Sequence, residues 1–296
     1  MSLSVAVIIA TKGRPQEVAR LLETLAVQTV PPDFVIVSAC GPDDIEDSRA
    51  HPQNVEIMFG PPGLTAQRNR ALGLIRGKYD IVIFFDDDFI PSRFWVERIA
   101  LLFAAQVDVG TVTGWVLLDA VKDGGLPWSE GKVLVDKADS STTMPTASNY
   151  GTRPNSPYGC NMAFRLKTIE GMTFDERLAL SGWLEDLDFG LRAGTRGKII
   201  STDFVWGVHL GVTNARASGL KFGYSQVVNP WYLMKKGIIK RLDAFKRISR
   251  GFAGNAIMVL AFQKSHVDRL GRLKGNITGI RDIIIGRWAP ERISQL

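Results

Sequence analysis

The stretch IVIFFDDDFIP (81–91) runs five apolar residues directly into Asp86, Asp87 and Asp88. A continuous β-branched and aromatic run of this length is typical of a buried strand. Folding alone does not require three adjacent like charges at its end, because buried carboxylates are costly to desolvate unless they are paired or bound to a metal. The stretch therefore predicts a buried strand that ends at a polar site.

The residues on either side of this stretch alternate between strand-like and helix-like patterns. Strands are predicted at VAVIIA (5–10), FVIVSA (34–39) and VEIMFG (55–60), and helices at 18–28 and 64–77. Strands that alternate with helices predict an α/β domain with a mixed, mostly parallel sheet flanked by helices.

The pattern continues beyond the aspartates with one interruption. Further helices are predicted at 91–105 and 183–194, and further strands at 109–118, 159–165 and 198–204. Residues 119 to 158 are rich in Gly, Ser, Thr, Pro and Asp and have little periodicity, so they are predicted to form a long loop.

Charge divides the chain into an acidic body and a basic tail. Residues 216–296 carry 16 Lys and Arg against 4 Asp and Glu, whereas the rest of the chain carries 20 against 26. This asymmetry indicates that the tail could bind an anionic partner, such as lipid headgroups, nucleic acid or a phosphorylated substrate. We therefore predict a catalytic domain over 1–212 and a basic, mainly helical extension over 213–296.

Cysteine content and the N-terminal pattern bear on the compartment. Cys40 and Cys160 stand alone, which indicates reduced thiols rather than a disulfide framework. The opening MSLSVAVIIATKGRP lacks a basic region before its apolar run, and that run has the length of a strand. We expect a cytoplasmic protein that could lie peripherally on the inner face of the cell membrane.

Polar residues follow three of the predicted strands. In parallel sheets, ligands bind beyond the carboxyl ends of the strands, so these residues are candidates for one binding crevice. They are Thr11, Lys12 and Arg14 after the first strand, Ser38 in the second, and Asp86 to Asp88 after the fourth.

The aspartates suit a hard divalent cation such as Mg²⁺, which takes one or two protein carboxylates and fills its shell with water and phosphate oxygens. The alternative is a solvated turn, but the apolar residues on both sides leave little room for one. His209 lies among apolar residues, where a histidine is usually a packed core residue. It could instead complete the shell of the metal, since imidazole suits Mn²⁺ and softer ions.

Two further polar pairs lie in predicted helices. Glu185 and Asp186 open the helix WLEDLDFGLR, where acids favour the helix dipole. Alternatively, they supply a general base to the same crevice. Arg68 and Asn69 in LTAQRNRAL form either an exposed polar face or a cation and an amide directed at nucleotide phosphates.

Taken in order, these segments resemble family 2 glycosyltransferases of the GT-A type. The similarity covers roughly residues 4 to 212. It rests on VAVIIATKGRP, GLTAQRNRAL, IVIFFDDDFIP, YGCNMAFR and GWLEDLDFGLR, which are similar to the opening strand, the G…ARN helix, the DxD segment, the acceptor-side strand and the ED…D…R motif of that family.

The resemblance implies a fold and a chemistry. A nucleotide-diphosphate sugar would bind through its pyrophosphate to Mn²⁺ or Mg²⁺, with Asp88 as the main ligand and His209 as a further one. Asp86 would contact the nucleoside or the shell of the metal. Asp186 would deprotonate an acceptor hydroxyl and Glu185 would help to place the acceptor, with inversion at the sugar carbon.

The same resemblance leaves the donor and the acceptor open. Ser38 stands where the family often has an acid that contacts the nucleobase, so the sequence departs from the pattern expected for a uracil base and leaves a thymidine or guanosine donor open. Family members often act on membrane-bound acceptors, which implies a saccharide or lipid-linked saccharide acceptor in polysaccharide or glycolipid synthesis.

The basic tail supports two interpretations. A basic amphipathic segment is typical of binding to an anionic membrane surface, but the tail could also pack on the body with its charges solvated. Glycines at 271, 275 and 279 fall on one helical face and predict close packing against a neighbouring helix.

Two other functions compete with a glycosyltransferase. A nucleotidyltransferase on a related sheet would need a Gly-rich basic signature after the first strand, of which TKGRP is a thin version. A nucleic-acid-binding protein would use the basic tail and show strong salt dependence, but the acidic crevice would have no purpose. We therefore expect no nucleic-acid partner.

Overall fold

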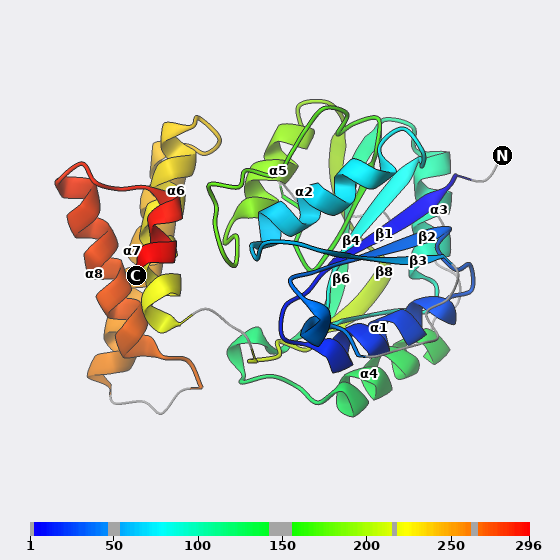
Figure 1. Ribbon diagram of the computed structural model, residues 1–296, viewed down its shortest axis with the longest axis horizontal. Helices are drawn as coiled ribbons and strands as arrows, with labels where there is room; N and C mark the ends of the chain where they lie inside the picture. The colour runs from blue at the N-terminus through cyan, green and yellow to red at the C-terminus, as the bar shows by residue number, and fades with distance from the viewer. Residues whose placement is uncertain (1–2, 47–53, 142–155, 215–217, 262–265) are drawn as a thin grey trace. The chain divides into compact units, whose positions relative to one another are not determined.

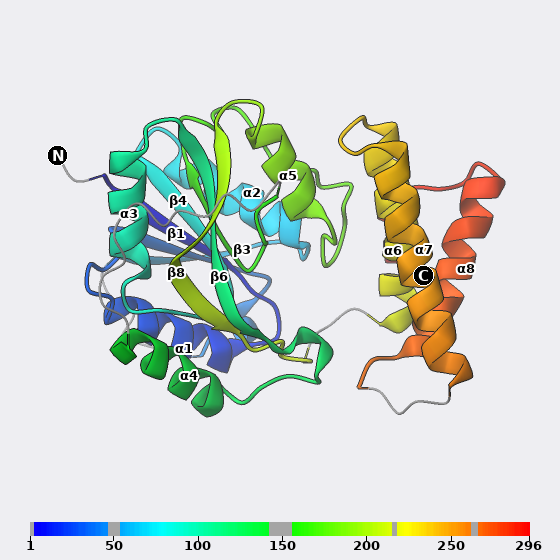
Figure 2. The same cartoon turned by 180° about the vertical axis from the view of Figure 1, so that it is seen from behind.

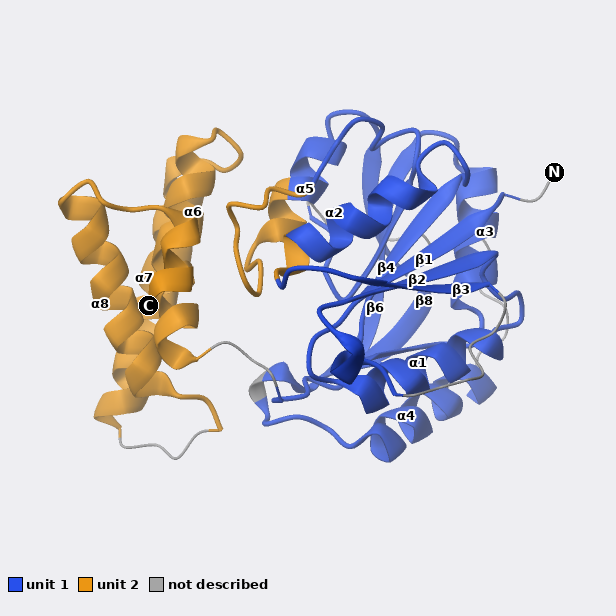
Figure 3. Ribbon diagram, in the orientation of Figure 1, with its two compact units in different colours: residues 1–62, 66–173, 189–215 blue, residues 63–65, 174–188, 216–296 orange. Residues whose placement is uncertain are grey.

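The computed structural model describes residues 3–46, 54–141, 156–214, 218–261 and 266–296 (Figure 1). The chain divides into two compact units (Figure 3). Unit 1 comprises Met1–Pro62, Ala66–Thr173 and Phe189–Ala215, and unit 2 comprises Gly63–Thr65, Phe174–Asp188 and Arg216–Leu296. The predicted domain boundary between residues 212 and 213 stays a prediction.

Within the described residues, unit 1 contains one eight-stranded sheet in the order β3-β2-β1-β4-β7-β6-β8-β5. The pairs β2–β3, β1–β2, β1–β4 and β6–β8 are parallel, and β4–β7, β6–β7 and β5–β8 are antiparallel. The mixed, mostly parallel sheet predicted from the sequence is confirmed. The strands are β1 Val5–Ala10, β2 Phe34–Ala39, β3 Val55–Phe59, β4 Ile81–Asp86, β5 Phe89–Pro91, β6 Val109–Asp119, β7 Asn161–Arg165 and β8 Lys198–His209.

Helices flank this sheet on both faces (Figures 1 and 2). They are α1 Pro15–Ala26, α2 Leu64–Ile75, α3 Trp95–Ala105, α4 Trp128–Ser141 and α5 Glu185–Ala193. Helix α1 and helix α4 cover one face, and α2 covers the other. The central strands are buried on both sides, which explains why β1 and β4 are continuous apolar runs rather than alternating ones.

Two sequence predictions in unit 1 are wrong. Pro91 does not open a helix but ends the short strand β5, and α3 begins four residues later at Trp95. Helix α4 lies inside the stretch predicted as a loop. Its periodicity was hard to detect because Gly131 and Asp139, four residues before and after the apolar Val135, occupy buried positions of the helix. Residues 142–155 of that predicted loop lie outside the described residues.

Unit 2 is helical, as predicted for the basic tail. It contains α6 Gly219–Lys235, α7 Arg241–Leu260, α8 Arg269–Ile284 and a short 3₁₀ helix, η3 Pro290–Gln295. A side chain at Gly275 of α8 would collide with the backbone of Leu220 and Tyr224 on α6, so the predicted close approach of helices at the glycines is confirmed. None of the described helices combines the length and apolar character that crossing a bilayer demands.

Candidate active site

The aspartate run lies where β4 ends and β5 begins. Strand β5 pairs antiparallel with β8, and in this register Phe89 lies opposite His209. His209 is therefore brought beside the aspartates although more than a hundred residues separate them in the chain. One ligand atom from each of Asp86, Asp88 and His209 lies within 4.8 Å of the others, and we call these three residues the aspartate corner.

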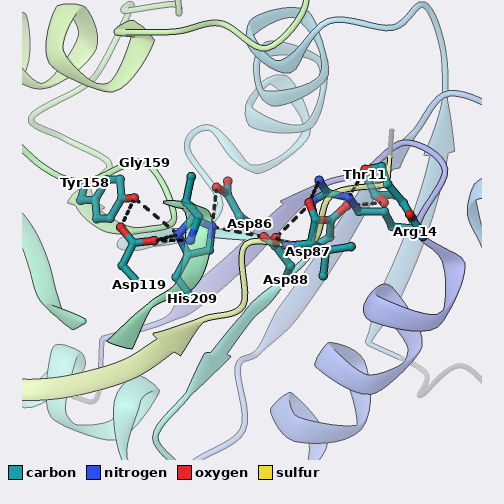
Figure 4. A network of polar contacts seen from close by, with 12 residues as sticks. Thr11, Arg14, Asp86, Asp87, Asp88, Asp119, Tyr158, Gly159 and His209 are labelled. Carbon is teal, nitrogen blue, oxygen red and sulfur yellow. Dashed lines mark hydrogen bonds and ion pairs between the residues drawn. The ribbon is translucent and has the colours of Figure 1, made fainter. Parts of the chain in front are cut away.

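The aspartate corner is held by direct polar contacts (Figure 4). His209 Nε2 lies 3.3 Å from Asp88 Oδ1 and 4.0 Å from Asp86 Oδ2. Asp88 Oδ2 accepts a hydrogen bond from the Val212 backbone N–H at 2.8 Å. Asp88 is almost fully buried, whereas 30% of the Asp86 side chain is exposed, so the corner opens on the side of Asp86.

Burial and charge together set the protonation of these groups. Burial alone would raise the pKa of Asp88, but the hydrogen bond and charge of His209, with the charge of Arg14, hold it below the ordinary value. Burial alone would lower the pKa of His209, but its contacts with Asp119 and Asp88 raise it to about 10. The protonated imidazole of His209 and the guanidinium of Arg14 therefore compensate the charge of Asp88, and a metal bound at Nε2 would replace the proton there.

Sequence reasoning missed Asp119 and Tyr158, which lie on the other side of the histidine ring. His209 Nδ1 lies 3.2 Å from Asp119 Oδ1, and Tyr158 donates a hydrogen bond to Asp119 Oδ2 at 2.8 Å. Asp119 is the last residue of β6. Strand β6 pairs parallel with β8, and in this register Asp119 lies opposite His209. The sequence did offer one signal for Asp119: it directly follows the predicted strand 109–118, and ligands bind beyond the carboxyl ends of parallel strands.

Asp87 is linked to the loop that follows β1. Thr11 Oγ1 donates to Asp87 Oδ2 at 2.7 Å, and Arg14 Nη1 lies 2.7 Å from Asp87 Oδ1. Burial raises the pKa of Asp87 to about 7, against the lowering effect of Arg14. Arg14 also donates to the backbone carbonyls of Val212 and Asn214, so it ties the loop to the segment after β8.

The remaining predicted contacts of unit 1 differ in exposure. Arg68 on α2 is buried, and its Nη2 lies 2.9 Å from Asp86 Oδ1. Ser38 is also fully buried, and its hydroxyl accepts a hydrogen bond from Arg70 at 2.9 Å. Lys12 is exposed and Asn69 is half-buried. The structure thus brings Thr11, Arg14 and Arg68 to the aspartates, whereas Ser38 points into the protein.

The predicted acid pair belongs to unit 2. Glu185 and Asp186 form the first turn of α5, and Glu185 is buried. Asp186 is partly exposed, and its Oδ1 accepts a hydrogen bond from the Leu187 backbone N–H at 2.8 Å. Their meeting with the aspartate corner stays a prediction.

The fold and the corner together define a class of protein. A mixed, mostly parallel sheet whose β4 leads into an Asp-x-Asp motif, with a histidine beside it, fits a GT-A type domain. The model of the family "Glycosyl transferase family 2" matches residues 6–130. This segment belongs to glycosyl transferase family 2, and the resemblance indicated by the sequence motifs is confirmed.

Solved structures extend the likeness of fold beyond this segment. S. aureus TarS 1–349 is 18% identical with a TM-score of 0.56, and the match covers 99% of this chain and 83% of that one. S. aureus TarS 1–349 in complex with UDP is 15% identical with a TM-score of 0.53, covering 97% and 83%. The chain matches 44% of a longer TarS chain. The comparison with curated proteins gave no match.

Proposed function

We propose that this protein is a metal-dependent, inverting glycosyltransferase that moves a sugar from a nucleotide-diphosphate donor to an acceptor hydroxyl. The observation that carries the proposal is the aspartate corner at the end of β4, whose Asp86 and Asp88 lie inside the segment that matches glycosyl transferase family 2. The likeness in fold to a protein solved in complex with UDP supports a nucleotide-sugar donor.

The side chains of the corner fit a divalent cation. Two carboxylates and an imidazole can present ligand atoms within 4.8 Å of one another, and both carboxylates are held by surrounding donors. Oxygen ligands suit Mg²⁺ and Mn²⁺, and the imidazole favours Mn²⁺. When bound, the cation would neutralise charge that develops on the departing diphosphate.

Residues around the corner would orient its ligands. With Nε2 of His209 facing the cation, Nδ1 would carry the proton and donate it to Asp119, which fixes the tautomer and the ring. Tyr158 would in turn hold Asp119 through its hydroxyl. Thr11 and Arg14 would keep Asp87 turned away from the ligand set.

The donor would lie along the polar residues at the carboxyl ends of the strands. Arg68 is buried beside Asp86 and would compensate its charge, and the exposed Lys12 would reach the phosphates. The proposed donor contacts are Thr11, Lys12, Arg14, Ser38, Arg68, Asn69, Asp86 and Asp87. Of these, Ser38 is the least accessible to a donor because its side chain is fully buried.

The acid pair would act on the acceptor. Asp186 would take the proton from the acceptor hydroxyl, which requires only that the two lie within hydrogen-bond reach. Glu185 would help to place the acceptor. The hydroxyl oxygen would form its bond to the anomeric carbon while the bond to the diphosphate oxygen breaks on the opposite face, which inverts the configuration.

A thermal-shift panel of UDP, dTDP and GDP, each with and without Mn²⁺, tests this proposal. We expect one nucleotide to raise the melting temperature only when Mn²⁺ is present. The variant Asp88→Ala should lose that shift. A panel in which no nucleotide gives a Mn²⁺-dependent shift would overturn the proposed donor site.

The acceptor and a membrane surface are the remaining proposed partners, and unit 2 bears on the second of them. We infer that the acceptor is a saccharide or lipid-linked saccharide and that α7 faces an anionic membrane surface, with the protein peripheral on the cytoplasmic side. Leu242, Ile257 and Leu260 are 63%, 64% and 77% exposed and share a helical face with Lys246 and Arg250. Apolar residues beside basic ones fit anionic lipid headgroups.

Vesicle sedimentation tests this surface. The protein should sediment with vesicles that contain phosphatidylglycerol and stay in solution with pure phosphatidylcholine. The double variant Lys246→Glu, Arg250→Glu should lose the binding. Equal sedimentation of variant and wild type would remove the membrane proposal without affecting the donor site.

A further inference from the structure

The segment Phe174–Asp188, which we call the acid segment, has a strained backbone just before α5. Leu180 and Leu184 have φ angles of 58° and 73°, in a region that residues other than glycine rarely occupy. Gly182 between them has a φ of 62°. Such strain persists only where surrounding contacts over-determine the conformation, so the neighbours of this segment matter.

Helix α6 supplies contacts to the middle of the acid segment. Asn229 Nδ2 donates a hydrogen bond to the Trp183 backbone carbonyl at 2.7 Å. The Trp183 ring packs edge-on against Phe222, with ring centroids 5.8 Å apart. Leu180 packs against a cluster that includes Tyr224 of the same helix. These contacts hold the strained residues against α6.

Lys236, which caps the C-terminus of α6, contacts both ends of the acid segment. Its Nζ lies 2.7 Å from Asp175 Oδ2 and 2.7 Å from Asp188 Oδ1. Tyr232, one turn earlier, donates its hydroxyl to Asp175 Oδ2 at 2.7 Å. The side chain of Asp188 is 1% exposed, so its charge depends strongly on a cation in contact.

We propose that Lys236 is a positioning residue whose ammonium group clamps the two ends of the acid segment and thereby fixes the first turn of α5. That turn carries Asp186, so this inference rests on the proposed role of Asp186 as the base. A base displaced by about 1 Å typically costs about 100-fold in turnover. The C-terminal helices would then be part of the catalytic machinery, not only a surface for lipid.

The variant Lys236→Met tests the clamp, with Lys235→Met as the matched control. Lys235 is the preceding residue, is exposed, and lies over the Trp231 ring at 5.4 Å. Hydrogen exchange is measured in peptides that cover 174–188. Turnover is measured as nucleoside diphosphate released from UDP-, dTDP- and GDP-hexoses with Mn²⁺. Nucleotide affinity with Mn²⁺ is measured by calorimetry.

We expect Lys236→Met to speed exchange in 174–188 and to lower turnover about 100-fold, with nucleotide affinity unchanged. Lys235→Met should behave as wild type in all three measurements. A merely structural role would lower nucleotide affinity and turnover together. Lys236→Arg, which retains a cation, should recover part of the turnover.

The outcomes separate the clamp from the proposed base. Unchanged exchange in Lys236→Met overturns the clamp. If Asp186→Asn retains wild-type turnover, the base is misassigned, whereas the exchange result still judges the clamp. If Asp186→Asn is inactive and Lys236→Met is fully active, the positioning role is wrong.

A milder variant covers the case in which Lys236→Met does not fold. Asp175→Asn removes the ion pair at one end of the clamp and keeps the ion pair of Lys236 with Asp188. We expect a smaller rise of exchange in the same peptides. Exchange identical to wild type in this variant would count against the clamp.

Discussion

The aspartate corner of unit 1 and the acid segment of unit 2 present acidic groups in two different ways. The corner is built on backbone: β4 leads through Asp87 and Asp88 into β5, which pairs with β8, and this register brings Asp86, Asp88 and His209 together. The acid segment has no strand to support it and is held by side chains of α6 and by Lys236.

This difference teaches where each site is vulnerable. Pairing within a sheet distributes the cost of one substitution over many backbone bonds, so loss of a ligand in the corner should affect binding and little else. A segment held by a few long side chains depends on each of them. Substitutions far along the chain should therefore disturb the acid segment and leave the corner intact.

The largest expected effect is on turnover in Asp186→Asn. Loss of a general base typically costs about 1000-fold, whereas the corner and its nucleotide affinity should be unchanged. Release of nucleoside diphosphate and calorimetry with Mn²⁺ measure the two quantities. The matched control is Glu176→Gln, an exposed acid of the same segment. Near-normal turnover in Asp186→Asn would mean that another residue is the base.

The corner itself is tested by Asp88→Ala. Nucleotide affinity in Mn²⁺ should fall about 100-fold or more, because a carboxylate ligand is lost, and the residual binding should no longer respond to Mn²⁺. Calorimetric titration of the nucleotide selected by the thermal-shift panel measures this. Asp203→Ala, an exposed acid on β8, serves as the control. Full Mn²⁺-dependent affinity in Asp88→Ala would refute its role as a ligand.

A smaller effect is expected when the orientation of His209 is disturbed. Asp119→Asn should weaken Mn²⁺ binding about 10-fold, because the partner that fixes the imidazole is weakened. Tyr158→Phe should have a smaller effect, since the Tyr158 hydroxyl is uncharged and lies 3.4 Å from His209 Nδ1, besides its hydrogen bond to Asp119. Electron paramagnetic resonance of free Mn²⁺ measures the affinity directly. If Asp119→Asn binds Mn²⁺ as tightly as wild type, Asp119 does not orient His209 for metal binding.

The smallest effect concerns acid stability of unit 2. Burial alone would raise the pKa of Asp175, but the hydrogen bonds from Lys236 and Tyr232 hold it below its ordinary value. This stabilisation is present above the unfolded pKa of about 3.9 and is lost as the pH falls through the lower folded value.

The variant Tyr232→Phe isolates this contribution. Its free energy of unfolding in urea should be lower than that of wild type by about 1 kcal/mol or less, because the carboxylate is partly exposed. The difference should be full at neutral pH and should shrink below about pH 4. A difference that stays constant down to pH 2 would show that Asp175 does not titrate as inferred.

Local sequence patterns predicted the parallel strands at the start of the chain well. Strands β1 and β2 have the predicted bounds, because continuous β-branched runs have few other ways to be buried. The pattern missed α4, because glycine and aspartate occupy buried positions there. It also misread Pro91, whose missing N–H suits a short edge strand as well as a helix start.

The candidate site was predicted only where its residues follow a recognisable strand or helix. Asp86 and Asp88 follow β4, and His209 ends β8, so position alone marked them. Asp119 was overlooked because a single acid at the start of a supposed loop carries no local signal. Lys236 was overlooked because it is one of many basic residues in the tail, and nothing in the neighbouring sequence distinguishes it from Lys235.

By itself, the sequence determined the alternation of strands and helices, the charged end of β4 and the helical character of the tail, because hydrophobic period and turn residues act over a few neighbours. Only the tertiary structure decided that His209 lies between Asp88 and Asp119, and that Lys236 joins Asp175 to Asp188. These contacts link residues that are far apart in the chain, and strand register and helix packing, which fix them, are properties of the folded whole.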